Sequence, residues 1–202
     1  MQIVGNQFTP SASRADLCTQ LTSGLEQDYQ VAYIVLDVAD YSNDGTVLDE
    51  FRDLAFCWTP GRPTDRVPEC LRNLMLDAGS RCLVWMSRRV CDYDDKLFSW
   101  VLLHELRHVF QYRRKSSYSE LRTYSELRRN ISNLRRQHRY INLPPSLFAP
   151  AEIDADLFAL NELSPVLNPF LVLPRCPLPA YNAFLAEAKP LWVSQFPVSA
   201  NE

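Results

Sequence analysis

Two kinds of apolar pattern run along the chain, and they predict different elements. Residues 31–38 (VAYIVLDV) and 81–87 (RCLVWMS) are rich in β-branched and aromatic side chains, so each predicts a buried strand. Apolar residues at helical spacing, with capping residues, prolines and glycines at the ends, predict helices over 13–27, 47–57, 68–79, 93–112, 117–139, 150–162 and 180–189. Two strands among many helices, without regular alternation, indicate the α+β class.

The most strongly helical segment, 93–112, carries the sequence His104-Glu105-Leu106-Arg107-His108. Histidines four residues apart on a helix project from one face, so His104 and His108 can bind the same metal ion. Glu105 falls at the edge of that face, where it can reach a water molecule at the metal without being a ligand. The opposite side of this helix carries leucines and a phenylalanine at core-facing spacing. The motif therefore predicts a zinc site with Glu105 as its catalytic base.

A catalytic zinc ion needs a third protein ligand. We favour Glu152, on the predicted helix 150–162, and keep His138 and Asp156 as alternatives. Glu152 and Asp156 share a helical face, so Asp156 could accept a hydrogen bond from a ligand imidazole and fix its tautomer. Glu152 also lies in the first turn of its helix, where a carboxylate is stabilised by the macrodipole even without a metal.

The segments HELRHVFQ and EIDADLFALNELSP resemble the gluzincin metalloproteases, whose HExxH helix is completed by a glutamate on a later helix. They are most similar to the small ImmA/IrrE-like peptidases of bacteria and phages. The resemblance implies a zincin-like fold: a small mixed sheet packed on an HExxH active-site helix and a second ligand-bearing helix. The chain departs from the family pattern at the charged Arg107 and in the 43 residues between His108 and Glu152.

We expect one zincin-like domain over residues 1–202. It consists of an α/β half over 1–92, metal-site helices over 93–165 with a basic insertion at 113–140, and a proline-rich tail over 166–202 with a short helix. The expected function is that of a zinc-dependent hydrolase cutting peptide bonds in a protein substrate. The donor that stabilises the oxyanion is left open among His138, Tyr140, Tyr112 and Tyr118.

The alternative function is that of a nucleic-acid-binding or regulatory protein with a structural or vestigial metal site. Its basis is the basic segment 113–139, which contains nine arginines and lysines against Glu120 and Glu126. Such a segment is either a solvated helix face or a surface that binds phosphates. Both functions could be combined if nucleic acid held a peptidase near its target.

Composition narrows the setting. The net charge is −3, and no apolar run is long enough to span a bilayer, so we expect no membrane association. The six cysteines are scattered, form no CxxC pair and lie partly in apolar runs, which favours buried thiols over disulfides. Together with the lack of a signal-peptide pattern, this predicts a cytoplasmic protein, with a secreted effector as the alternative.

Overall fold

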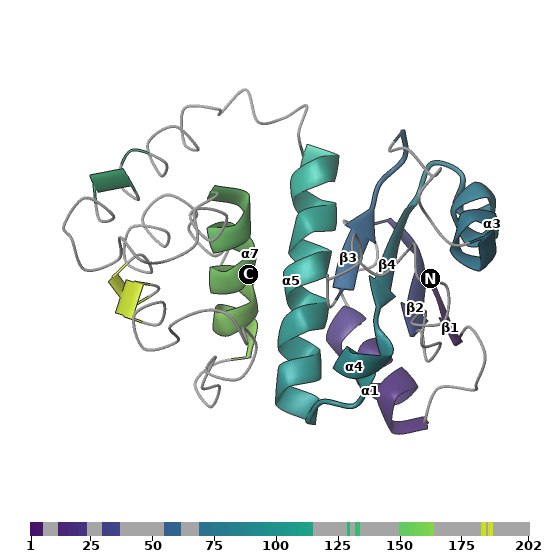
Figure 1. Cartoon of the computed structure of the whole chain (residues 1–202), viewed down its shortest axis with the longest axis horizontal. Helices are drawn as coiled ribbons and strands as arrows, with labels where there is room; N and C mark the ends of the chain where they lie inside the picture. Colours follow the sequence, from purple (N-terminus) through teal and green to yellow (C-terminus); the bar gives the residue numbers. More distant parts are fainter. Residues whose placement is uncertain are drawn as a thin grey trace, which may run out of the picture. The chain divides into compact units, whose positions relative to one another are not determined.

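The structure is a computed structural model that describes residues 1–5, 12–23, 30–36, 55–61, 69–114, 129, 132–133, 150–163, 183–184 and 186–187. The chain divides into two compact units, Met1–Arg113 and Arg114–Glu202. The first unit contains, in chain order, β1 (Gln2–Gly5), α1 (Ala12–Thr22), β2 (Val31–Leu36), β3 (Ala55–Trp58), α3 (Glu69–Ala78), β4 (Cys82–Met86), α4 (Arg88–Cys91) and α5 (Asp95–Arg114), which ends at the unit boundary (Figure 1).

The four strands form one mixed sheet in the order β1-β2-β4-β3. Strands β1, β2 and β4 are parallel, whereas β3 runs antiparallel to β4. In the register, Ile34 lies opposite Ile3 on one side and Val84 on the other. The expected α+β class with a small mixed sheet is therefore confirmed.

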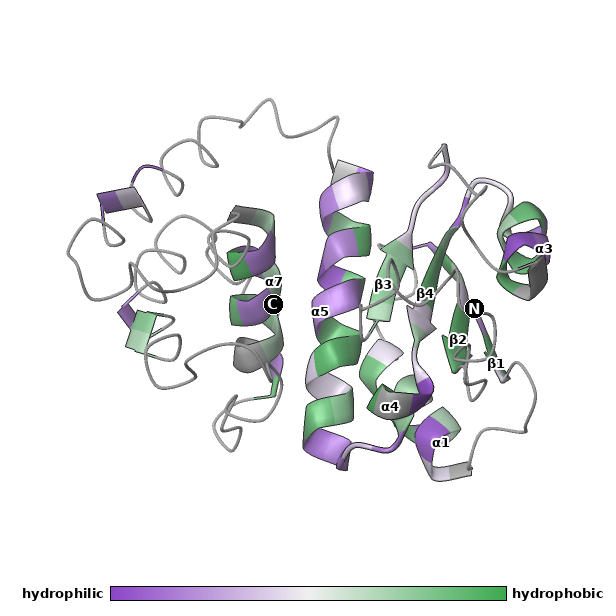
Figure 2. Cartoon of the chain, in the orientation of Figure 1, coloured by the Kyte–Doolittle hydropathy of each residue, from purple (hydrophilic) through white to green (hydrophobic). Residues whose placement is uncertain are grey.

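Strands β2 and β4 occupy the centre of the sheet, and both are fully buried. Every residue of β2 and every residue of β4 is buried, which is the pattern of near-continuous apolar runs in parallel strands. Figure 2 shows hydrophobic residues along β2 and β4. The two predicted strands at 31–38 and 81–87 match these elements.

Strands β1 and β3 were not predicted. The helix expected over 47–57 is wrong at its end, because Ala55–Trp58 pairs as a strand with β4; residues 47–54 lie outside the described part. The parallel βαβ unit formed by β1, α1 and β2 was not predicted either. A four-residue strand contains too few positions for a period of two to be distinguished from a helical pattern.

Helix α3 packs on one face of the sheet. Leu71, Met75 and Ala78 are buried in one cluster with Tyr33 and Trp85 of the sheet. The helix ends where the sequence predicts, because Gly79 follows it with φ of +62°, a left-handed conformation that suits glycine at the helix C-terminus.

Helix α5 begins after Asp94, whose carboxylate accepts a hydrogen bond from the Leu97 amide at 2.9 Å. Near its other end, the Tyr112 hydroxyl donates to the Pro60 carbonyl at 2.8 Å, and Arg113 donates to Gln30 beside the start of β2. The contacts of Tyr112 and Arg113 thus connect the C-terminal end of α5 with other parts of the first unit.

In the second unit, α7 (Pro150–Glu162) has the bounds that the sequence predicts. Its residues 153–159 are buried. The predicted basic helix over 117–139, and most of the predicted helix over 180–189, lie outside the described residues. The single domain over 1–202 stays a prediction. Among the described residues, no helix combines the length and apolar character needed to cross a bilayer.

Candidate metal centre

The two motif histidines face each other on α5. The Nε2 atoms of His104 and His108 are 3.1 Å apart, and the ring planes are nearly perpendicular, at 84°. Two nitrogens bound to one tetrahedral zinc ion at 2.0–2.1 Å would be about 3.3 Å apart. The pair therefore already has nearly the separation that a shared zinc ion requires, as the four-residue spacing predicts.

A third residue on the same helical face contacts the pair. Nδ1 of His108 lies 2.8 Å from Oε1 of Gln111, three residues further along α5. Gln111 was not predicted as a site residue, although its i+3 spacing from His108 was a usable signal. Gln111 thus contacts Nδ1 of His108, whereas Nε2 of the same ring faces His104.

His104 and His108 are less buried than the residues beside them on α5. All residues from Leu97 to Val109 are buried except the two histidines, which are half-buried. One turn before His104, the ring of Trp100 lies 5.4 Å from the His104 ring, centroid to centroid. The indole Nε1 of Trp100 is buried without a hydrogen-bond partner. Within the stretch 97–109 of α5, the two imidazoles are thus the partly exposed side chains.

Glu105 and Arg107, the charged residues between the histidines, are both buried. Glu105 is 8% exposed, and the aliphatic and guanidinium groups of Arg107 are almost as well covered, at 9%. The Arg107 guanidinium lies 4.5 Å above the centre of the Phe110 ring, a cation–π arrangement. This contact gives a packing reason for a charged residue at a position that the resembled family keeps uncharged.

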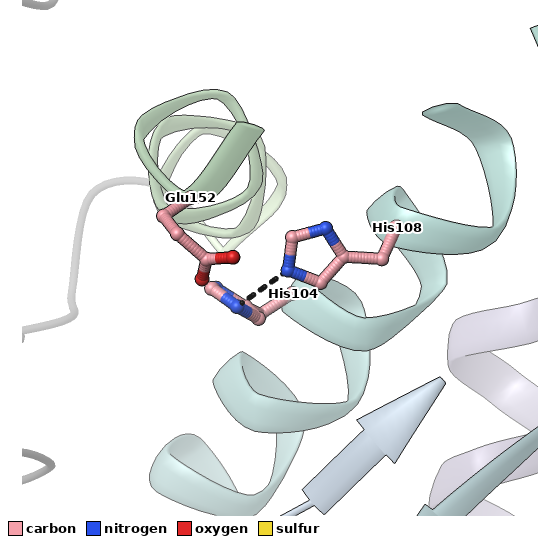
Figure 3. Close-up of side chains that lie close together, drawn as sticks. All are labelled: His104, His108 and Glu152. Carbon is pink, nitrogen blue, oxygen red and sulfur yellow. Dashed lines mark hydrogen bonds between the residues drawn. The ribbon is translucent and has the colours of Figure 1, made fainter. Parts of the chain in front are cut away.

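Glu152, the preferred third ligand, is half-buried in the first turn of α7. His104, His108 and Glu152 each offer one ligand atom, and these atoms lie within 4.8 Å of one another (Figure 3). Two imidazole nitrogens and one carboxylate oxygen form a donor set that suits zinc. These three residues could hold a metal ion.

The other predicted site residues have separate outcomes. Asp156 is 3% exposed and its neighbour Asp154 is fully buried, so α7 contains two covered carboxylates. The role of Asp156 beside an imidazole stays a prediction, and the Nδ1 atom of His108 is already in contact with Gln111. The hydroxyl hydrogen of Tyr112 is used by the Pro60 carbonyl. His138, Tyr140 and Tyr118 lie outside the described residues.

Four of the described cysteines are thiols. Cys18, Cys57 and Cys82 are buried, and Cys91 is half-buried. Burial raises the pKa of Cys18 to about 12 and the pKa of Cys82 to about 11. Since the thiolate is the nucleophile and the metal ligand, these two residues are unsuited to either role at neutral pH.

Similarity to known proteins does not assign a function to this group of side chains. The chain matches no protein-family model, no curated protein and no solved structure in the comparisons made. The functional interpretation therefore depends on the side chains described above, and chiefly on the histidine pair of α5.

Proposed function

We propose that this chain is a zinc-dependent peptidase of the zincin type, in which His104, His108 and Glu152 bind the metal ion and Glu105 is the catalytic base. The observation that carries the proposal is the pair of Nε2 atoms 3.1 Å apart on one face of a single helix. That separation and the half-buried state of both rings suit a shared ion that substrate can reach.

The donor set supports a catalytic rather than a purely structural site. Structural zinc sites in proteins are closed by four protein ligands, whereas catalytic sites have three and leave one position open. The group of potential ligands found among the described residues has three members. Two histidines with a glutamate is the ligand set of known zinc peptidases.

Each residue then has a defined task. A zinc ion held by His104, His108 and Glu152 would supply a Lewis acid for the scissile carbonyl and would lower the pKa of a water molecule to about 7. Glu105, next to His104 but outside the ligand set, accepts a proton from the attacking water and delivers it to the leaving amine. The burial of Glu105 limits the conformational freedom of its side chain, which favours a fixed orientation of the base.

The decisive variant is Glu105→Gln, which keeps the size of the side chain and removes the proton acceptor. Cleavage of a synthetic peptide library, followed by mass spectrometry, is expected to fall at least about 100-fold, the lower range for loss of a general base. Zinc content by atomic emission and the far-UV circular dichroism spectrum are expected to stay unchanged. Glu162→Gln, at an exposed position of α7, is the matched control. Equal cleavage by Glu105→Gln and the parent would exclude Glu105 as the base, and no cleavage by the parent would count against the proposal.

The third ligand has its own test. Glu152→Ala is expected to weaken zinc binding strongly, because the ion would keep two protein ligands, while Glu162→Ala on the same helix should bind zinc as the parent does. Isothermal titration with zinc measures both. Asp156→Asn is a second comparison, and a larger loss there than in Glu152→Ala would move the assignment to Asp156.

The nucleic-acid alternative depends on the basic segment 113–139. Within this segment, Arg113 donates to Gln30 and Arg129 is exposed. This alternative stays a prediction. Binding to DNA that weakens steeply with added salt would support it.

A further inference from the structure

The contact between His108 and Gln111 determines which nitrogen of His108 carries hydrogen. Oε1 of Gln111 is an amide carbonyl oxygen and can only accept. At 2.8 Å from this oxygen, Nδ1 of His108 must therefore donate, so the hydrogen of the neutral ring is on Nδ1. The Nε2 atom of His108 is then left with its lone pair, directed at His104.

The two histidines differ in which ring nitrogen carries the hydrogen. The Nε2 atoms are 3.1 Å apart, which is a hydrogen-bond distance when no ion lies between them. Because Nε2 of a neutral His108 accepts, Nε2 of His104 has to donate. Before metal binding, His108 thus has the tautomer that a metal ligand needs, while His104 has to move its hydrogen away from Nε2.

We propose that Gln111 is a positioning residue that holds His108 in the Nδ1–H tautomer and so keeps its Nε2 available to a divalent cation. Metal binding by His108 rests on the proposed function, whereas the tautomer of His108 depends only on its contacts with Gln111 and His104. The geometry supports it because His104, His108 and Gln111 share one helical face, with His108 in contact with both neighbours. Hydrogen-bonding partners of this kind orient the ligand ring and raise its basicity.

Three variants test the role. Gln111→Met keeps the length and the helix propensity of the side chain and removes the acceptor. Gln111→Glu keeps an acceptor oxygen at nearly the same place. Gln20→Met changes an exposed glutamine on α1 and is the matched control for the substitution itself.

The first measurement is zinc affinity of the full chain by competition with a chromogenic chelator. Gln111→Met is expected to bind zinc about tenfold or more weakly, the usual effect of losing such a partner. Gln111→Glu is expected to bind at least as tightly as the parent, and Gln20→Met to be unchanged. Both replacements of Gln111 fill nearly the same space. Retained zinc affinity in Gln111→Glu, with a loss in Gln111→Met, therefore separates a role as hydrogen-bond acceptor from a role in packing.

The second measurement reads the tautomer directly in the metal-free full chain. Long-range ¹H–¹⁵N correlation spectra of protein with ¹⁵N-labelled histidine show which ring nitrogen is protonated, and His108→Asn identifies the His108 signals among the three histidines. We expect Nδ1–H for His108 in the parent and in Gln111→Glu. In Gln111→Met we expect a mixture of both tautomers.

The results separate this inference from the proposed function. If Gln111→Met keeps both the parent zinc affinity and the Nδ1–H tautomer, Gln111 is not a positioning residue. If the parent binds no zinc, the proposed function fails. The tautomer spectra then still decide whether Gln111 fixes the ring of His108.

Discussion

Arg14 on α1 holds the start of α5, and Arg14→Ala is expected to weaken the first unit. Its guanidinium donates to the Cys91 carbonyl at 3.2 Å, to the Tyr93 carbonyl and to the Asp95 carboxylate at 2.7 Å. It also lies 4.7 Å above the centre of the Phe98 ring. One side chain thus connects α1 with the segment that leads into the helix of the histidine pair.

The contacts contribute unequally to the free energy of unfolding. The Asp95 side chain is 81% exposed, so this ion pair contributes about 0.5 kcal/mol or less. Hydrogen bonds from a charged donor to the two partly buried carbonyls contribute about 1 kcal/mol each. The cation–π contact adds roughly 0.5–1 kcal/mol. Arg14→Ala should therefore cost about 2.5–3.5 kcal/mol, and Asp95→Asn less than about 0.5 kcal/mol.

Urea unfolding followed by tryptophan fluorescence measures both variants. Arg14→Lys should recover only part of the loss, because an ammonium group cannot reach three acceptors with the fixed geometry of a guanidinium. If Arg14→Ala and Asp95→Asn lowered the free energy of unfolding by the same amount, the exposed ion pair, and not the carbonyl contacts, would be the stabilising interaction, contrary to the prediction.

Three further predictions concern the thiols, the end of α3 and the metal. Cys18 and Cys82 should not react with a thiol reagent at pH 8 until the chain is unfolded. Their pKa values are about 12 and 11 in the folded chain and near 8.5 in an unfolded one. The contribution of these thiols to the free energy of unfolding is therefore complete below about pH 8.5 and is lost as the pH rises through 11–12. Urea unfolding at several pH values would show this loss. Gly79→Ala should cost about 1 kcal/mol or slightly more through its φ of +62° alone, since no atom lies within 4 Å of the added carbon, and Gly79→Asn should cost less. Zinc at 100 times its dissociation constant should stabilise the folded chain by about 2.7 kcal/mol, and a chelator should remove this gain; an unchanged melting temperature would contradict zinc binding.

Local pattern was sufficient for the elements that are long or that have clear ends. Helix α5 was predicted because its periodicity extends over several turns, and α7 because a proline lies at its start and Ser164-Pro165 follows its end. The facing of His104 and His108 was also predictable, since a spacing of four residues on a helix fixes their relative direction without any tertiary contact.

Strands β1 and β3 were decided by pairing. The four residues AFCW carry no periodicity of their own, and they become a strand because β4 offers an unpaired edge to which their backbone groups can bind. Sequence could not supply this, as the partner lies about 28 residues away and its availability depends on the register of the whole sheet.

At the candidate centre, the sequence by itself determined the histidine pair and the choice of Glu152 as a possible partner. Only the tertiary structure decided which side chains are covered, so the burial of Glu105 and the unsatisfied indole of Trp100 were not predictable. The hydrogen-bond partner of His108 lies between these cases: its spacing is local, but the rotamers that bring Gln111 to Nδ1 depend on packing around the helix. The physical reason is that backbone geometry fixes direction within one helix, whereas burial and side-chain conformation depend on what the rest of the fold places beside it.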